Sequence, residues 1–100
     1  MIDFKEKIDF DWDEGNIDKN QIKHNVHFKE CEEVFLNKPM IDKDIKHSLK
    51  EKRYFCLGET NKKRYLFISF TIRNYKIRVI SARPMSKKER RIYEKIKKNS

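Results

Sequence analysis

The arginines are the side chains in this sequence best suited to bind a phosphate, and two of them lie at the ends of predicted strands. Arg53 begins one predicted strand, and Arg83 precedes Pro84, which ends another. A guanidinium grips two phosphate oxygens in a fixed fork, which a lysine cannot do. We therefore predict that Arg53 and Arg83 bind a phosphate from neighbouring or near-neighbouring strands. A structural ion pair with a carboxylate is the alternative for each arginine.

Histidines could transfer protons. His24 is the first candidate for a general acid or base, because the side-chain chemistry of histidine suits proton transfer near physiological pH. Lys23 precedes it and could add positive charge. Interaction of His24 with the dipole and the carbonyls at a helix C-terminus is an equally good interpretation. His27 and His47 are weaker candidates, since neither lies in a strong motif.

Positive charge is concentrated in the second half of the chain. The net charge is +9, with a balance of −5 over residues 1–45 and +14 over residues 46–100. This asymmetry predicts a polyanionic partner, with nucleic acid as the first candidate and an acidic protein as the second. A lysine-rich surface kept only for solubility is the alternative. The cations assigned to nucleic-acid binding are Arg64, Arg78, Lys87, Lys88, Arg90 and Arg91.

Glu51 and Tyr93 complete the set of candidate catalytic residues. Glu51 could act as a base, although orientation of Arg53 is the favoured role. Tyr93 could stack on a nucleobase or donate a proton, although packing of the last helix on the sheet is favoured. Cys31 and Cys56 have no second cysteine or histidine at metal-ligand spacing, so we expect buried thiols. The sequence predicts neither a metal site nor a cofactor.

Length and hydropathy predict one small domain. One hundred residues suffice for one domain and not for two, and we expect this domain to occupy residues 1–100. No stretch approaches the roughly 18 apolar residues that a membrane span needs. Residues 1–6 also lack the apolar block of a signal peptide. We therefore expect a cytoplasmic protein with no membrane partner.

The sequence predicts three helices, over residues 17–24, 27–35 and about 86–97. Asn25 follows the first helix, where a residue in the left-handed conformation belongs. Apolar residues of the second recur at spacings of three and four, as in an amphipathic helix. Ser86 and Glu89 form a capping box that begins the third helix, which is strongly basic.

The sequence also predicts strands, over residues 9–12, 40–42, 53–57, 64–73 and 75–83. Residues 64–73 are the clearest case, with apolar residues at every second position. Gly58 is expected to end the strand over residues 53–57, and residues 43–50 are expected to form a loop. Short polar links, one of them at Asn74, favour hairpins and therefore an antiparallel meander. Helices gathered on one side of an antiparallel sheet make an α+β domain.

Four segments in chain order resemble the BrnT toxin family. They are FDWD at residues 10–13, KHNVHF at 23–28 with EVF at 33–35, EKRYFCLG at 51–58, and IRVISARPMSKKERRIYE at 77–94. Asn25 departs from the family, which often has Gly there, but Asn also tolerates the left-handed conformation. The resemblance covers about residues 8–95, and it transfers no roles to residues 38–46.

The resemblance implies a RelE-like fold, a compact antiparallel sheet with two N-terminal helices and one C-terminal helix. It implies a ribonuclease toxin of a type II toxin–antitoxin system that inhibits translation and arrests growth. It also implies neutralisation by a BrnA-like ribbon-helix-helix antitoxin, and binding of operator DNA only through the toxin–antitoxin complex. A non-catalytic RNA- or DNA-binding module with the same basic face is the alternative that composition alone leaves open.

The residue types fit metal-independent RNA cleavage. In this reaction the ribose 2′-hydroxyl attacks the neighbouring phosphate. The reaction needs a base near the 2′-oxygen, positive charge around the phosphorus and an acid at the 5′-oxygen. The sequence has no clustered His, Asp and Glu at metal-ligand spacing, which favours this chemistry. We therefore expect a metal-independent endoribonuclease that uses Arg53 and Arg83, with the base and the acid left unassigned.

Overall fold

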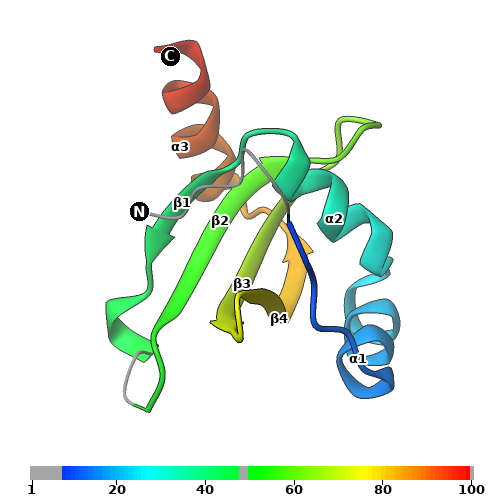
Figure 1. Cartoon of the computed structure of the whole chain (residues 1–100). Helices are drawn as coiled ribbons and strands as arrows, with labels where there is room; N and C mark the ends of the chain where they lie inside the picture. Colours follow the sequence, from blue (N-terminus) through cyan, green and yellow to red (C-terminus); the bar gives the residue numbers. More distant parts are fainter. Residues whose placement is uncertain (1–7, 48–49, 100) are drawn as a thin grey trace.

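The computed structural model describes residues 8–47 and 50–99 (Figure 1). Its elements, in chain order, are α1 (Glu14–His24), α2 (Phe28–Leu36), β1 (Met40–Lys43), the 3-10 helix η1 (Ile45–His47), β2 (Arg53–Glu59), β3 (Tyr65–Arg73), β4 (Lys76–Pro84) and α3 (Lys87–Lys98). None of the helices in these residues is long and apolar enough to cross a membrane.

The four strands form one antiparallel sheet in the order β1-β2-β3-β4. The turn between β3 and β4 has positive φ at Asn74 (52°) and Tyr75 (65°), as the tightest hairpin turns require. Because neighbouring strands are antiparallel, β2 and β4 run in the same direction. The predicted α+β fold with an antiparallel sheet, two N-terminal helices and one C-terminal helix is confirmed.

One face of the sheet forms the hydrophobic core with α2 and the segment that precedes α1. Leu66, Ile68 and Phe70 alternate along β3 and are fully buried, as the sequence pattern predicts. Phe35 of α2 packs edge-on against Phe70, with 4.9 Å between ring centroids. Phe10, Trp12, Ile41 and Tyr54 are partly buried around this core.

Gly58 lies inside β2 and does not close it. The strand continues to Glu59, so the expectation that it ends at residue 57 is wrong. A Cβ atom at Gly58 would meet Val34 Cγ1 at 2.6 Å and Pro39 Cβ at 3.1 Å. The glycine is needed because α2 and the chain that follows it approach the strand backbone closely.

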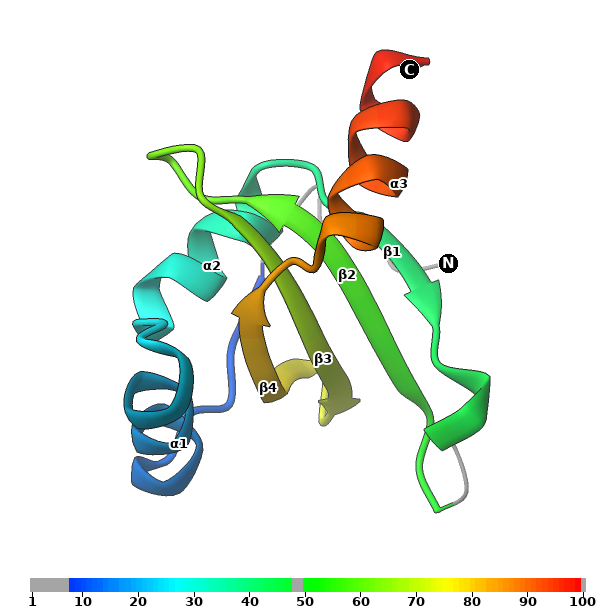
Figure 2. The same ribbon diagram turned by 180° about the vertical axis from the view of Figure 1, so that it is seen from behind.

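The opposite face of the sheet carries α3 at one end (Figure 2). The predicted capping box is present, since Ser86 and Glu89 each accept a hydrogen bond from the backbone N–H of the other. Tyr93 is buried against Tyr65, with 5.2 Å between ring centroids. The Lys97 ammonium donates to Glu59 Oε1 at 2.7 Å. These contacts bind the basic helix to the sheet.

Three other local predictions need correction. Residues 9–12 make only one parallel bridge, between Phe10 and Ile77, and not a longer strand. α1 begins three residues earlier than predicted, because the Asp13 carboxylate accepts from the Asn16 N–H at 2.9 Å and so caps its first turn. The predicted loop over residues 43–50 contains η1, and its residues 48 and 49 lie outside the described part.

Candidate active site

A groove at one end of the sheet collects four cations and a histidine. Its volume is about 540 Å³. The sides of the groove come from η1, from the start of β2 and from the end of β3. The groove therefore contains two of the predicted catalytic residues, one weaker candidate and three residues that the sequence did not point to. The lining residues are Lys46, His47, Lys50, Glu51, Arg53 and Arg73.

His47 is held by a carboxylate of the same turn. Its Nδ1 atom lies 3.0 Å from Asp44 Oδ2 and 3.1 Å from Oδ1. The backbone N–H of Asp44 donates to the carbonyl of Arg53 at 2.8 Å, which ties the turn to the start of β2. The His47 side chain is 59% exposed. A carboxylate beside Nδ1 favours the tautomer with hydrogen on Nδ1, and this leaves Nε2 able to accept a proton.

Glu51 forms a two-point ion pair with Arg73. Arg73 Nε donates to Oε2 at 3.2 Å, and Nη2 donates to Oε1 at 3.1 Å. Arg53 was the partner of Glu51 expected from the sequence. The strand register explains the pair with Arg73. Arg53 is opposite Thr71, and the strands are antiparallel, so Glu51, two residues before Arg53, comes opposite Arg73, two residues after Thr71. The pair orients the Arg73 guanidinium at the edge of the groove.

Arg83 lies towards the opposite end of the sheet from Arg53. Arg53 pairs with Thr71 of β3, whereas Arg83 pairs with Phe67 of the same strand. Four residues along a strand span about 13 Å. The two arginines do lie on near-neighbouring strands, as expected. The structure nevertheless does not bring them together around one phosphate.

The contacts of Arg83 tie α3 to the sheet. Its two terminal nitrogens donate to the two carboxylate oxygens of Glu89, both at 2.8 Å, and its guanidinium lies 4.3 Å from the centroid of Phe67. The hydrogen bond with Arg83 lowers the pKa of Glu89, and the same bond raises the pKa of Arg83. Glu89 thus occupies the two guanidinium nitrogens with which Arg83 was predicted to bind a phosphate. Phosphate binding by Arg83 stays a prediction.

The other catalytic candidates lie outside the groove. His24 ends α1, next to Lys23, and its carbonyl accepts a hydrogen bond from Arg64 at 3.2 Å. Arg64 precedes β3 and Arg73 ends it, so about 30 Å of chain separates this position from the groove. Tyr93 is 5% exposed, and burial raises the pKa of its hydroxyl. Catalytic roles for His24, Lys23 and Tyr93 stay predictions.

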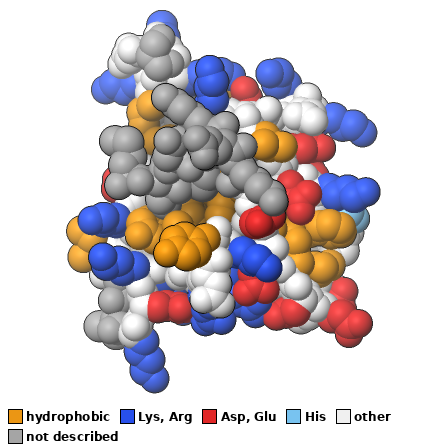
Figure 3. Space-filling view, viewed as in Figure 1, with side chains coloured by type: hydrophobic (Ala, Val, Ile, Leu, Met, Phe, Trp, Pro, Cys, Tyr) orange, Lys and Arg blue, Asp and Glu red, His pale blue; other side chains and the backbone are white. Residues whose placement is uncertain are grey.

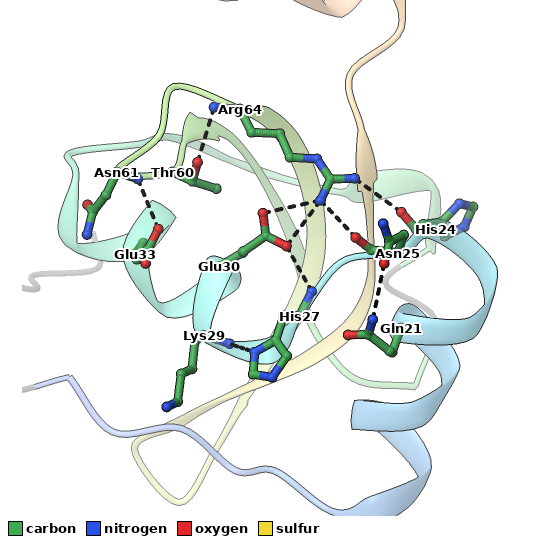
Figure 4. Close-up of polar contacts among 10 residues, drawn as sticks. All are labelled: Gln21, His24, Asn25, His27, Lys29, Glu30, Glu33, Thr60, Asn61 and Arg64. Carbon is green, nitrogen blue, oxygen red and sulfur yellow. Dashed lines mark hydrogen bonds and ion pairs between the residues drawn. The ribbon is translucent and has the colours of Figure 1, made fainter.

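Arg64 joins both N-terminal helices to β3 (Figure 4). Its guanidinium donates to the carbonyl of Asn25 at 2.8 Å and to the carboxylate of Glu30 at 3.1 and 3.2 Å. Asn25 has a φ of 51°, which confirms the predicted left-handed conformation after α1. These bonds, with the bond to His24, hold the junction between α1 and α2. The RNA contact assigned to Arg64 from the sequence stays a prediction.

The remaining predicted RNA-binding residues divide between an ion pair and the surface of α3. Arg78 binds Asp13 at 2.6 Å and Asp11 at 3.5 Å, and the hydrogen bond with Asp13 raises the pKa of Arg78. This pair ties β4 to the N-terminal segment. The predicted RNA-binding cations of α3 are exposed; they are Lys87, Lys88, Arg90 and Arg91. RNA binding by Arg78 and by these four residues stays a prediction.

Both cysteines are buried free thiols, as predicted. Burial raises the pKa of Cys31 to about 12 and also raises the pKa of Cys56. Both are therefore protonated at physiological pH and poor nucleophiles. Within residues 8–47 and 50–99, no group of three or more His, Cys, Asp or Glu side chains is placed to hold a metal ion.

Lys46, Lys50 and Arg73 are in the groove without having been predicted from the sequence, and His47 was only a weaker candidate. Residues 46 and 73 are far apart in the chain and meet only through the strand register. One signal was present, since residues 46–53 contain four cations and a single acid. Figure 3 shows Lys and Arg side chains at this end of the sheet, beside η1, and acidic side chains around α1.

Comparison with known proteins places the chain in a family. A family model described as the ribonuclease toxin BrnT of type II toxin–antitoxin systems matches residues 12–89. The crystal structure of the Brucella abortus ribonuclease toxin BrnT is similar, with a TM-score of 0.57 and 24% identity, over 81% of this chain and 100% of that one. No curated protein matches this chain.

The fold is that of a small α+β toxin with a cationic groove at one end of its sheet. The family match covers most of the chain, and the chain belongs to the BrnT family of ribonuclease toxins of type II toxin–antitoxin systems. The resemblance found in the sequence is thereby confirmed. Membership implies an RNA substrate and an antitoxin partner.

Proposed function

We propose that this toxin is a metal-independent endoribonuclease whose active site is the groove beside η1. The observation that carries the proposal is the convergence of His47, held by Asp44, with two arginines and two lysines in one groove. The groove combines a group that can accept a proton with several positive charges. These are the requirements for attack of a 2′-hydroxyl on the adjacent phosphate.

His47 acts as the general base in this proposal. Its Nε2 atom takes the proton of the ribose 2′-hydroxyl, and the 2′-oxygen attacks the adjacent phosphorus. The bond from phosphorus to the 5′-oxygen then breaks, and the 5′-oxygen takes a proton from water, so that the upstream product ends in a 2′,3′-cyclic phosphate and the downstream product begins with a 5′-hydroxyl. Asp44, 3.0 Å from Nδ1, fixes the orientation of the ring and stabilises the imidazolium that forms.

Arg53 and Arg73 bind the phosphate oxygens. Glu51 holds Arg73 at two points, so that its guanidinium is oriented before the substrate arrives. The phosphate oxygens gain charge in the transition state, so a fixed cation stabilises that state more than the ground state. Lys46 and Lys50 add positive charge around the same groove.

In the cell, we propose that this activity destroys messenger RNA in the cytoplasm, inhibits translation and arrests growth. A BrnA-like ribbon-helix-helix antitoxin neutralises the toxin by direct binding, and the complex binds operator DNA. The excess of positive charge over residues 46–100 supports an acidic partner surface, because complementary charge speeds encounter. A toxin that permits normal growth when expressed in soluble form without its antitoxin would contradict this account.

The test is cleavage of a labelled single-stranded RNA by purified variants. His47→Ala and Arg53→Ala are each expected to slow cleavage by about 10²–10³-fold, the usual cost of one such contact, in protein that circular dichroism shows to be folded. Lys29→Ala changes an exposed lysine of α2, on the other face of the sheet, and serves as the control with full activity.

Two outcomes would count against the proposal. A folded His47→Ala protein with full cleavage activity would remove His47 from the mechanism. Wild-type protein that binds the RNA but never cleaves it would favour the alternative, a non-catalytic RNA- or DNA-binding module.

A further inference from the structure

Two phenylalanines and an arginine form a stack across three strands, on the face of the sheet opposite α1 and α2. The rings of Phe55 on β2 and Phe67 on β3 are nearly parallel, with an interplanar angle of 13° and 5.6 Å between centroids. The guanidinium of Arg83 on β4 lies 4.3 Å from the centroid of Phe67. All three side chains are half-buried, unlike the core residues that alternate with them.

This stack is continuous with the groove. Phe55 and Arg53 are two residues apart on β2, so they share one face of the sheet and lie about 7 Å apart along the strand. Phe67, Ser69 and Arg73 occupy the same face of β3 by the same alternation. Figure 2 shows α3 at the far end of this face, and no other described element crosses β2 and β3 between α3 and the groove.

The charges around the stack indicate what it binds. The groove at one end contributes two arginines and two lysines, and Arg83 lies within the stack itself. Glu51 pairs with Arg73 and Glu89 with Arg83, but these five cations still outnumber the two carboxylates, and a purely apolar protein segment would not complement that excess of positive charge. A nucleic acid supplies phosphates for the cations and flat bases for the rings, and base–aromatic stacking accepts every base because each has a π-face.

We propose that this face binds unpaired nucleobases of the RNA substrate and places the neighbouring phosphate in the groove. The inference rests on the proposed active site and names its substrate class as single-stranded RNA. Bases in a duplex stack on one another and do not offer their faces to a protein. Stacking on Phe55, Phe67 and Arg83 thus selects for single strands without selecting a sequence.

The test uses a fluorescent RNA oligonucleotide with 2′-O-methyl riboses, which cannot be cleaved by 2′-hydroxyl attack. Its affinity is measured alone and annealed to its complement, by fluorescence anisotropy at low salt. Phe55→Leu and Phe67→Leu keep apolar volume on the sheet but remove the flat ring. Phe28→Leu makes the same change in α2, on the opposite face, and is the matched control.

We expect each variant of the stack to weaken binding of the single strand at least about fivefold, which is the low end for loss of base–aromatic stacking. Duplex affinity should stay within error of wild type, and each variant should stay folded with a melting temperature only a few degrees lower, since one aromatic pair is lost. Phe28→Leu should bind the single strand normally. If a base analogue such as 2-aminopurine is placed in the strand, its fluorescence should be quenched by wild-type protein and less by Phe55→Leu.

The inference would be overturned if folded Phe55→Leu and Phe67→Leu bound the single strand with wild-type affinity. It would also be overturned if the two variants lost affinity for the duplex and for the single strand by the same factor. If these variants lost binding of the antitoxin but still bound RNA normally, the inference would also be overturned, and the face would be a protein interface. The proposed active site fails separately: it is contradicted if folded His47→Ala cleaves RNA normally, whatever the phenylalanine variants do.

Discussion

Replacement of Arg64 by alanine should destabilise the protein, and RNA binding should change little. Arg64 is one of the residues assigned to RNA from the sequence. In the structure its guanidinium donates to two backbone carbonyls, of His24 and Asn25, and to the carboxylate of Glu30. Arg64→Ala would leave the end of α1 and the start of α2 without their shared connection to β3.

The expected size of the effect follows from these contacts. A hydrogen bond that involves a charged group contributes about 1.5–3 kcal/mol, but the Arg64 and Glu30 side chains are 33% and 27% exposed, so water replaces part of the loss. We expect a net loss of about 2 kcal/mol. In a domain of this size, 1 kcal/mol shifts the melting temperature by about 4–8 °C, so the shift should be about 8–16 °C.

Thermal unfolding by circular dichroism measures this shift. Arg64→Lys should recover less than half of it, because one ammonium cannot reach both carbonyls and the carboxylate with the fork of a guanidinium. Lys62→Ala removes an exposed cation two residues earlier and should leave the melting temperature unchanged. An unchanged melting temperature in Arg64→Ala, together with weaker RNA binding, would show that the sequence-based assignment to RNA was right.

Three further predictions concern the sheet and α3. Gly58→Ala should lower the free energy of unfolding by about 1–3 kcal/mol, because a methyl group would meet Val34 at 2.6 Å. Urea denaturation measures this loss, and an unchanged free energy of unfolding would contradict the prediction. The hydrogen bond from Lys97 lowers the pKa of Glu59 below 4.5, so its stabilising contribution is present above that pH and is lost as the pH falls through the lower folded-state value. Glu59→Gln should therefore flatten the loss of stability below pH 4.5 in an acid titration. Arg83→Ala should lower the melting temperature, with partial recovery in Arg83→Lys; full stability with no cleavage would instead make Arg83 a phosphate-binding residue.

The helices and strands were predictable from the sequence because short-range patterns of residues determine them. The alternation of apolar residues in β3, the capping box of Ser86 and Glu89, and the left-handed Asn25 each depend on residues a few positions apart. The errors came from long-range packing. Gly58 predicts the end of a strand from the sequence alone. In the structure it lies within β2, and a glycine is needed there because α2 packs closely against the strand.

The site was less predictable because it depends on strand direction and register. Arg53 and Arg83 both lie near strand ends, but β2 and β4 run in the same direction, so the start of one and the end of the other lie far apart. Arg73 meets Glu51 only because of the pairing between β2 and β3. His47 gains its partner Asp44 through one turn of 3-10 helix, and nothing in the linear pattern distinguishes that turn from a loop.

The chemical ends of the RNA products distinguish metal-independent attack by the 2′-hydroxyl from metal-dependent hydrolysis. Purified toxin is incubated with single-stranded RNA in excess EDTA, and the new ends are identified by mass spectrometry. We expect undiminished cleavage, with 2′,3′-cyclic phosphate on the upstream fragment and 5′-hydroxyl on the downstream fragment, and about 10²–10³-fold slower formation of both products by His47→Ala. Cleavage that stops in EDTA and resumes with a divalent cation, or products that end in 3′-hydroxyl, would contradict a metal-independent attack by the 2′-hydroxyl.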